Sequence, residues 1–280
     1  MCIRDRLDTP PWEWPRDAGK TFRKTLLDGR ADPADRLIAA DLAGDTVAIN
    51  DDLADVLLTI VRNPGEPEEL RAKAATSFGP ALEMAFTEFD EAANGFDDPD
   101  CVPITEDMFR NIQDSLQELY LDASTPKLVR RRILEGSVRC PEPWHQDAIR
   151  AAYDSGDREW VLTAVFGMRW VRGFEEEVLA QLESADEKIH FEAVVAAGNK
   201  ELDAAWPHVA AIVKDAHTPK DLLIAAIGAV GSIRPAEAGV LLVDLADSDD
   251  EDIAEAADEA MMMAELVSDD EEDEEGEWIN

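Results

Sequence analysis

The feature that most constrains the fold is an apolar pattern that recurs about every 30 residues in the second half of the chain. Each copy places a bulky apolar residue four positions before a residue that falls on the same side of a helix. The copies are Val129/Ile133, Trp160/Ala164, Ile189/Ala193, Leu222/Ala226 and Ile253/Ala257, with an earlier copy at Leu70/Ala74. The first members of the five later copies lie 31, 29, 33 and 31 residues apart. A fixed period of this length predicts repeated units that bury their apolar faces against one another.

Each period has room for two helices. Several copies begin with helix-start residues, such as the pair Thr218-Pro219 and the carboxylates of Asp157 and Asp186. A second amphipathic stretch separates successive copies, at residues 144–153, 174–182, 205–213 and 236–245. Two helices joined by short turns in every period predict an all-α solenoid of stacked helical hairpins.

The first half of the chain shows the pattern less clearly. We interpret residues 32–43 and 51–61 as one helix pair, and residues 66–78 and 81–92 as the next. A loop at residues 95–103 and a helix at 105–121 follow.

These patterns predict three parts of the chain. They are an N-terminal extension over residues 1–30, a single solenoid domain over 31–266 and a disordered acidic tail over 267–280. Residues 269–275 are all Asp or Glu, and like charges at this density repel. The first six residues, Met-Cys-Ile-Arg-Asp-Arg, look like a translated sequencing adapter, so we attach no meaning to Cys2.

The charge of the chain opposes several classes of partner. The formal net charge is -37, and a field of this sign repels nucleic acid and anionic membranes. Either the acidic surface serves a basic partner or it only keeps the protein soluble. Of these two interpretations, we favour solubility.

Cysteine usage and hydropathy indicate a cytoplasmic protein. The three cysteines form no CxxC pair and are too few for a disulfide framework. No apolar run approaches the roughly 20 residues that a membrane helix needs, and the N-terminus lacks the apolar core of a secretory signal. We expect a monomer that does not bind membranes.

Four segments resemble bacterial HEAT-repeat proteins, including the phycobilin-lyase HEAT-like group: residues 126–130, 157–167, 186–198 and 219–231. The resemblance covers roughly residues 30 to 266. It implies an armadillo-type α/α superhelix, a right-handed solenoid of HEAT-like hairpins, and most often a role as an interaction scaffold. The Val-Arg pair of such repeats is present at Val129-Arg130 and, loosely, at Leu70-Arg71, but becomes Ile189-His190 later. We therefore expect no regular polar ladder between repeats.

The sequence contains no familiar catalytic motif. The four histidines form no His-Glu dipeptide of the kind that holds iron in HEAT-repeat hydroxylases, and there is no HExxH motif or zinc spacing. Phosphate-binding glycine motifs and GxSxG are also missing. We therefore predict no enzyme activity, no metal and no cofactor.

Two groups of residues stand out as candidate partner contacts. Arg130-Arg131-Arg132 either docks a carboxylate or phosphate group or pairs with acidic neighbours, and we favour the pairing. Trp144-His145 and Trp206-Pro207-His208 begin two second helices, which in HEAT solenoids usually line the concave surface. Exposed Trp and His there would suit a partner. In the simpler interpretation, which we favour, each Trp fills a gap between repeats and each His is an exposed helix-start residue. Met261-Met262-Met263 is interpreted as a cap on the last repeat.

The predicted function is a non-enzymatic scaffold that binds a partner protein through its concave face. The candidate contacts are Arg130, Arg131, Arg132, Trp144, His145, Trp206 and His208. The alternative is a lyase-like or chaperone-like protein that holds a chromophore or cofactor for attachment to another protein. That alternative predicts a cavity lined by Trp144, Tyr153 and Trp206 with His145 as its polar group. Nucleic-acid processing is a third possibility and requires a basic groove around Arg130.

Overall fold

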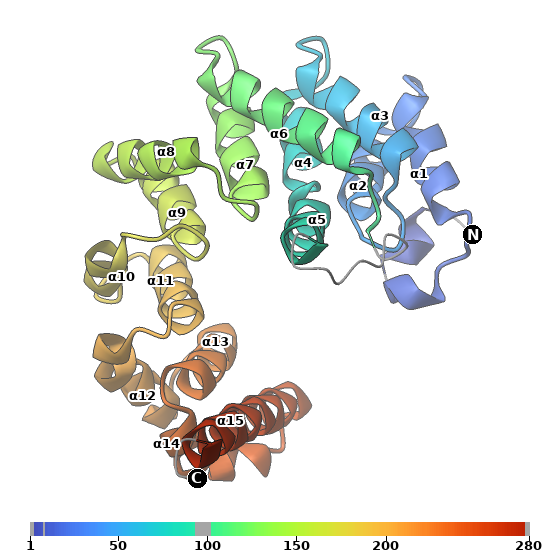
Figure 1. The fold of residues 1–280 in the computed structure, drawn as a ribbon. Helices are drawn as coiled ribbons and strands as arrows, with labels where there is room; N and C mark the ends of the chain where they lie inside the picture. The colour runs from blue at the N-terminus through green and yellow to red at the C-terminus, as the bar shows by residue number, and fades with distance from the viewer. Residues whose placement is uncertain (1–2, 8, 93–101, 278–280) are drawn as a thin grey trace. The chain divides into compact units, whose positions relative to one another are not determined.

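The computed structural model describes residues 3–7, 9–92 and 102–277, and these residues form helices with no strand among them. The all-α prediction is therefore confirmed. Contacts divide the chain into two compact units, Met1–Ala148 and Ile149–Asn280, where the sequence had led us to expect one domain over 31–266. Cys2 and most of the predicted loop at 95–103 lie outside the described residues. Figure 1 shows the helices of both units.

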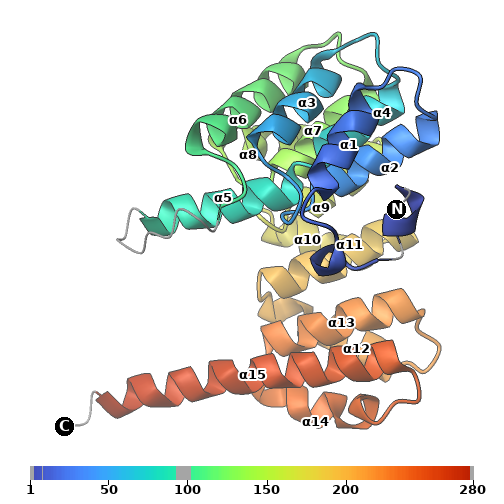
Figure 2. The same ribbon diagram turned by 90° about the vertical axis from the view of Figure 1, so that its right-hand side faces the viewer.

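Unit 1 is built from two layers of helices (Figures 1 and 2). The layers are held by contacts of α2 with α4 and α4 with α7 on one side, and of α1 with α3 and α3 with α6 on the other. Helix α5 packs against α6 and α7. The elements are η1 (Arg4–Arg6), η2 (Pro11–Glu13), α1 (Ala18–Leu27), α2 (Pro33–Ala43), α3 (Asp51–Arg62), α4 (Glu68–Thr76), α5 (Gly79–Ala92), α6 (Glu106–Leu121) and α7 (Lys127–Ser137), with α8 (Pro143–Asp154) crossing the boundary.

The hairpins of unit 1 pair differently from the prediction. Helix α1 packs on α2, α3 on α4, and α6 on α7, whereas we had paired residues 32–43 with 51–61. The reason is α1, which buries Ala18, Phe22 and Leu26 on one face. This amphipathic helix lies in the segment that we had interpreted as an extension, so the assigned pairs were displaced by one helix.

Unit 2 repeats the same two-layer arrangement. Helices α9, α11, α13 and α15 contact one another in sequence along one layer, and α10, α12 and α14 pack beside them. The elements are α9 (Arg158–Gly167), α10 (Glu175–Gln181), α11 (Glu187–Asn199), η3 (Asp203–Ala205), α12 (Trp206–Lys214), α13 (Lys220–Ile233), α14 (Pro235–Ala246) and α15 (Glu251–Glu277).

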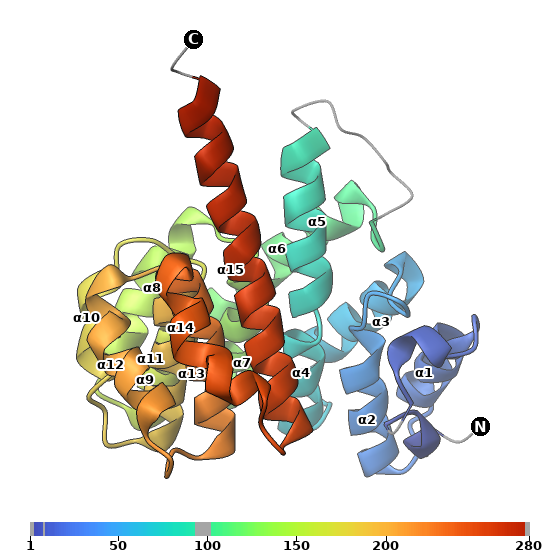
Figure 3. The same ribbon diagram turned by 90° about the horizontal axis from the view of Figure 1, so that it is seen from below.

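Helix α15 includes residues 269–275, which we had expected to be disordered. Figures 2 and 3 show α15 extending past the ends of α13 and α14. Glu is a good helix former, and the acidic segment continues a helix whose first turns are packed on both neighbours. Helix propensity and continuity therefore oppose the repulsion on which the prediction relied.

The repeated pairs occupy equivalent places in the core. Their second members are all completely buried: Ala74, Ile133, Ala164, Ala193, Ala226 and Ala257. They lie on α4, α7, α9, α11, α13 and α15, which we call the repeat-layer helices. Small residues predominate at these positions because neighbouring helices of the layer pack side by side.

At two helix crossings, α11 with α13 and α7 with α4, the two backbones are in close contact. A Cβ atom added to Gly198 on α11 would lie 2.8 Å from the Cα atom of Ala229 on α13. A Cβ atom added to Gly136 on α7 would lie 2.4 Å from the carbonyl oxygen of Ala75 on α4. Real Cβ atoms do not come this close to backbone, so only glycine permits the observed spacing.

We predict that Gly198→Ala destabilises the protein by about 1–3 kcal/mol, because the added methyl group forces α11 and α13 apart. Gly228→Ala on α13 is the matched control, since a Cβ atom there meets nothing within 4 Å. That control should be neutral or stabilising by up to about 1 kcal/mol through helix propensity. Urea denaturation of both variants measures the difference, and equal effects at the two positions would contradict the close approach.

Three arginines of unit 1 join consecutive helices in one repeated way. Each donates to the carbonyl oxygen of the residue ten positions earlier, the second-last residue of the preceding helix, at 2.9, 2.9 and 2.8 Å: Arg36 to Leu26, Arg71 to Val61 and Arg130 to Tyr120. A helix leaves its last carbonyl groups without partners, and these guanidinium groups satisfy one of them. A regular polar link therefore exists within the hairpins of unit 1. It joins the two helices of one hairpin and does not test the expectation about a ladder between repeats.

Unit 2 does not continue the arginine link. The position of Arg130 is held there by His190, and before α13 the Thr218 hydroxyl donates instead to the carbonyl oxygen of Ile212 at 2.8 Å. The replacement of the Val-Arg pair that the sequence shows thus occurs in unit 2.

We predict that Arg71→Met costs about 1–3 kcal/mol, because the buried carbonyl of Val61 loses its donor. Lys73→Met is the control on the same helix, since Lys73 pairs with Asp41 at the exposed surface. An exposed pair of this kind contributes less than about 1 kcal/mol. Chemical denaturation should rank the two variants in that order, and the reverse order would show that the carbonyl link is not stabilising.

Candidate functional site

The three consecutive arginines are engaged within unit 1. Arg130 donates to Tyr120 and also lies over its ring, 5.1 Å from the centroid. Arg131 is 5% exposed and pairs with Glu135, which also accepts a hydrogen bond from Arg132. The prediction that Arg131 contacts a partner is therefore wrong, because α7 is buried over most of its circumference. The arrangement favours the pairing interpretation of the cluster over the docking one.

His145 is completely buried, so its predicted role as an exposed partner contact is also wrong. Its Nδ1 atom accepts the backbone N–H of Glu142 at 2.9 Å, and its Nε2 atom lies 2.9 Å from the Ser137 hydroxyl. Because Nδ1 accepts, Nε2 carries the proton and donates to Ser137, which in turn donates to the carbonyl of Ile133 at 2.8 Å. The nitrogen that faces Ser137 is thus protonated and is not a base for that hydroxyl.

Trp144 and Cys140 complete this cluster. The Trp144 ring stacks on His145 with 3.8 Å between ring centres and contacts the Tyr120 ring. The Cys140 thiol is buried and donates to the carbonyl oxygen of Ser137 at 3.2 Å. Burial raises the pKa of Cys140 to about 12 and lowers the pKa of His145 to about 4. The cluster therefore has uncharged His and Cys side chains near neutral pH and acts as packing for α7 and α8.

Trp206 and His208 lie on α12 in unit 2, where both are half-buried. The Arg234 guanidinium lies over the Trp206 ring, 5.2 Å from its centroid. The Nε2 atoms of His208 and His190 are 2.9 Å apart, and His208 Nδ1 is 3.4 Å from Glu183. Burial and the neighbouring His208 lower the pKa of His190. The His208–His190 contact joins α12 to α11, and Arg234 covers Trp206 from the junction of α13 and α14. The contact of Trp206 favours the interpretation of this residue as packing between repeats.

Two hollows open between repeat-layer helices of unit 2, and neither is lined by any of the seven predicted partner contacts. The smaller, which we call the α9–α11–α13 hollow, has a volume of about 300 Å³. Its apolar lining includes Leu162, Phe191 and Leu222, and its rim carries Glu187, Lys188, Glu192 and Asp221. The predicted contacts Trp206 and His208 lie on α12, which belongs to the other layer of unit 2.

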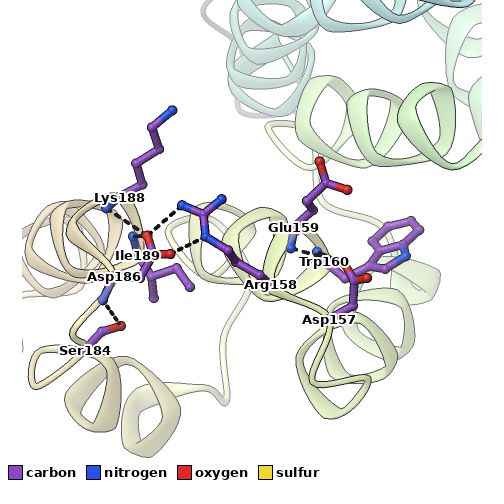
Figure 4. A network of polar contacts seen from close by, with 8 residues as sticks. All are labelled: Asp157, Arg158, Glu159, Trp160, Ser184, Asp186, Lys188 and Ile189. Atoms are coloured by element: carbon purple, nitrogen blue, oxygen red, sulfur yellow. Dashed lines mark hydrogen bonds and ion pairs between the residues drawn. The ribbon is translucent and has the colours of Figure 1, made fainter.

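A link between helix starts supports this hollow (Figure 4). The Asp186 carboxylate accepts backbone N–H groups of Lys188 and Ile189 at 3.1 and 3.3 Å, and so caps α11. The same carboxylate pairs with Arg158 from the first turn of α9. Hydrogen bonding from Arg158 lowers the pKa of Asp186. One carboxylate thus fixes the start of α11 relative to α9, beside the hollow.

The larger cavity, the α13–α15 hollow, has a volume of about 660 Å³. Its floor is made of apolar and small residues from the two helices and the turn between α13 and α14: Ile224, Gly228, Gly231, Ile233, Pro235, Ala256, Ala260 and Met263. Ser232, Glu201 and Glu259 supply its polar atoms. The hollow is therefore apolar inside and acidic where charge is present.

Glu201 has an unusual backbone conformation. It follows the end of α11 with φ of 52°, the only non-glycine residue with positive φ among the described residues. The next residue, Leu202, donates its N–H to the carbonyl of Ala197 at 3.0 Å, which completes a helix-end motif that usually has glycine at this point. A side chain here costs about 1 kcal/mol.

A sequence signal for these hollows was present and overlooked. An apolar residue occurs two positions after the first member of three consecutive copies, at Leu162, Phe191 and Ile224. Each lines one of the hollows and remains half-buried. The repeat period thus marks the lining as well as the core.

Metal and membrane sites are not indicated in the described part of the chain. No group of three or more His, Cys, Asp or Glu side chains there is arranged to hold a metal ion. No described helix combines the length and apolar character needed to cross a membrane.

Comparisons with known proteins give a limited likeness. No family model matches the chain, and no curated protein matches it. Among solved structures, YibA of Escherichia coli is similar with a TM-score of 0.43 and 15% identity, over 93% of this chain and 85% of that one. Human deoxyhypusine hydroxylase, solved in complex with glycerol, is similar with a TM-score of 0.39 and 14% identity, over 90% and 97%. At these scores the likeness carries no argument about activity.

The buried histidine generates a pH prediction. Because the pKa of His145 is about 4 when folded and about 6.5 when unfolded, the unfolded chain binds the proton first. Stability is therefore lost as the pH falls below the unfolded value, by about 2 kcal/mol between about pH 7.5 and pH 5 from this residue alone. His145→Gln should flatten that part of the pH dependence, whereas His217→Gln, which alters an exposed ring, should not. Denaturation across this pH range measures the slope, and identical slopes would refute the assignment.

Proposed function

We propose that this helical-repeat protein binds another protein through the repeat-layer face of unit 2. The observation that carries the proposal is the pair of hollows with apolar floors between α9, α11, α13 and α15. Grooves between parallel-running helices are common sites for partner segments, and apolar surface left accessible on a charged protein indicates an interaction site.

Apolar side chains at the two hollows remain partly accessible. The formal net charge of -37 favours solubility, and accessible apolar groups contribute nothing to it. Even so, Leu162, Phe191 and Ile224 are only half-buried at the hollows, and Met263 is 55% exposed. Burial of such side chains by a partner is favourable by roughly 25 cal/mol for each Å² of apolar area removed from water.

The competing functions receive less support from the geometry. A chromophore cavity requires Trp144, Tyr153 and Trp206 around His145, but His145 is buried, and the Tyr153 hydroxyl accepts a hydrogen bond from Gln181. Neither hollow of unit 2 is lined by any of these four residues. A basic groove for nucleic acid requires accessible guanidinium groups at Arg130, whose cluster is engaged within unit 1.

The proposal is tested by site-specific crosslinking. A photoreactive residue at Phe191, in the α9–α11–α13 hollow, should crosslink a discrete partner protein in extract from the organism that encodes the chain. The same residue at Val240, which is 86% exposed on α14, is the control and should give no such product.

The captured protein is then purified and its affinity measured directly. Phe191→Asp should weaken binding by about tenfold or more, equivalent to about 1.4 kcal/mol, because a charge replaces the apolar lining. Circular dichroism confirms that the variant is folded. Products of equal yield from both crosslinking positions, or an unchanged affinity for folded Phe191→Asp, would overturn the proposed function.

A further inference from the structure

We propose that the α13–α15 hollow receives a basic amphipathic helix of the partner, with apolar side chains on the floor and Lys or Arg groups beside Glu201 and Glu259. This inference rests on the proposed function and adds the chemistry of the partner to it. It is carried by the shape of the floor, the charges around it and the backbone of Glu201.

The floor has room for inserted side chains. The hollow of about 660 Å³ is larger than its neighbour, and a Cβ atom added to Gly228 at its floor would meet nothing within 4 Å. Ile224 and Ile233 supply apolar surface, and Met263 is a flexible side chain that adapts to different occupants. An amphipathic helix presents a stripe of apolar residues that can enter an apolar hollow between two helices.

The charges of the hollow are available to an incoming cation. Glu201 and Glu259 are both exposed, and neither has an ion-pair partner among the described residues. Lys200, which directly precedes Glu201 in the sequence, lies 4.0 Å from the Glu175 carboxylate. Two further basic residues of unit 2 are also paired. Lys220 binds Asp250 and Asp252, and Arg234 binds Asp203 and Glu237. No Lys or Arg follows Arg234 in the sequence.

The backbone of Glu201 gives an independent indication. Glycine would relieve the positive φ at this helix end, yet a glutamate is present there and lines the hollow. Strained residues of this kind are found where a side chain is needed for binding or catalysis. The retained carboxylate is explained if it contacts a cationic group of the partner.

The sign of the charge excludes other occupants. Nucleic acid and anionic lipid would bring further negative charge to the two carboxylates. A second copy of this chain would bring another formal net charge of -37. A basic segment of a different protein is the occupant that the electrostatics favour.

The test uses the full chain and a defined probe. The probe is a fluorescent peptide of about 18 residues, five helical turns, with a stripe of Leu and flanking Lys. A scrambled peptide of the same composition has no apolar stripe and controls for non-specific attraction. Affinities are measured by fluorescence anisotropy at low and high salt.

Two matched pairs of variants locate the binding. Gly228→Leu fills the floor, and Gly239→Leu places the same side chain on α14, where a Cβ atom also meets nothing within 4 Å. Glu201→Gln with Glu259→Gln removes the two carboxylates of the hollow. Glu255→Gln with Asp258→Asn removes the same charge from exposed positions on α15 outside the lining.

Binding of the amphipathic peptide should fall about tenfold or more in Gly228→Leu and stay within about twofold in Gly239→Leu. The Glu201 and Glu259 double variant should also bind more weakly and show less dependence on salt than its control pair. Equal binding of the scrambled peptide, or equal effects of the matched variants, would overturn the inference. If these results are negative while Phe191 still governs capture of the partner, the proposed function stands and only the assignment of a basic segment fails.

Discussion

The structure depends on the close approach of repeat-layer helices at small residues. Gly136 meets α4 and Gly198 meets α13 at distances that leave no space for a Cβ atom. Around these points, alanines of the repeated pairs are completely buried. The spacing between these helices is therefore set by backbone contact. The hollows of unit 2 lie between helices whose separation is fixed elsewhere.

Much of the fold followed from periodicity, and the features that periodicity missed have identifiable physical causes. The repeated pairs identified α4, α7, α9, α11, α13 and α15 because burial of one helix face imposes a regular pattern on the sequence. The division into two units did not follow, since it depends on how many contacts cross residue 148 and not on any local signal. Helix α1 was missed because its basic, polar sequence obscures a buried face of only three residues.

The candidate site was less accessible to sequence reasoning. His145 and Arg131 are polar residues and were expected at the surface, but each is buried with its polar atoms bonded: His145 to Glu142 and Ser137, and Arg131 to Glu135. Satisfied polar groups tolerate burial, and the sequence does not display their partners. The hollows were missed for a different reason. Which layer carries the accessible apolar residues depends on how the layers pack, although Leu162, Phe191 and Ile224 recur in phase with the core.

The buried thiol of Cys140 has a practical consequence for observing this molecule. All three cysteines belong to the sequence of unit 1, and unit 2 has none. Thiol reagents attack the thiolate, which Cys140 scarcely forms while it is enclosed and its pKa is raised to about 12. Its rate of alkylation therefore measures how often the cluster around Ser137 opens to water. Motion of one half of the protein can be timed in this way without any introduced label.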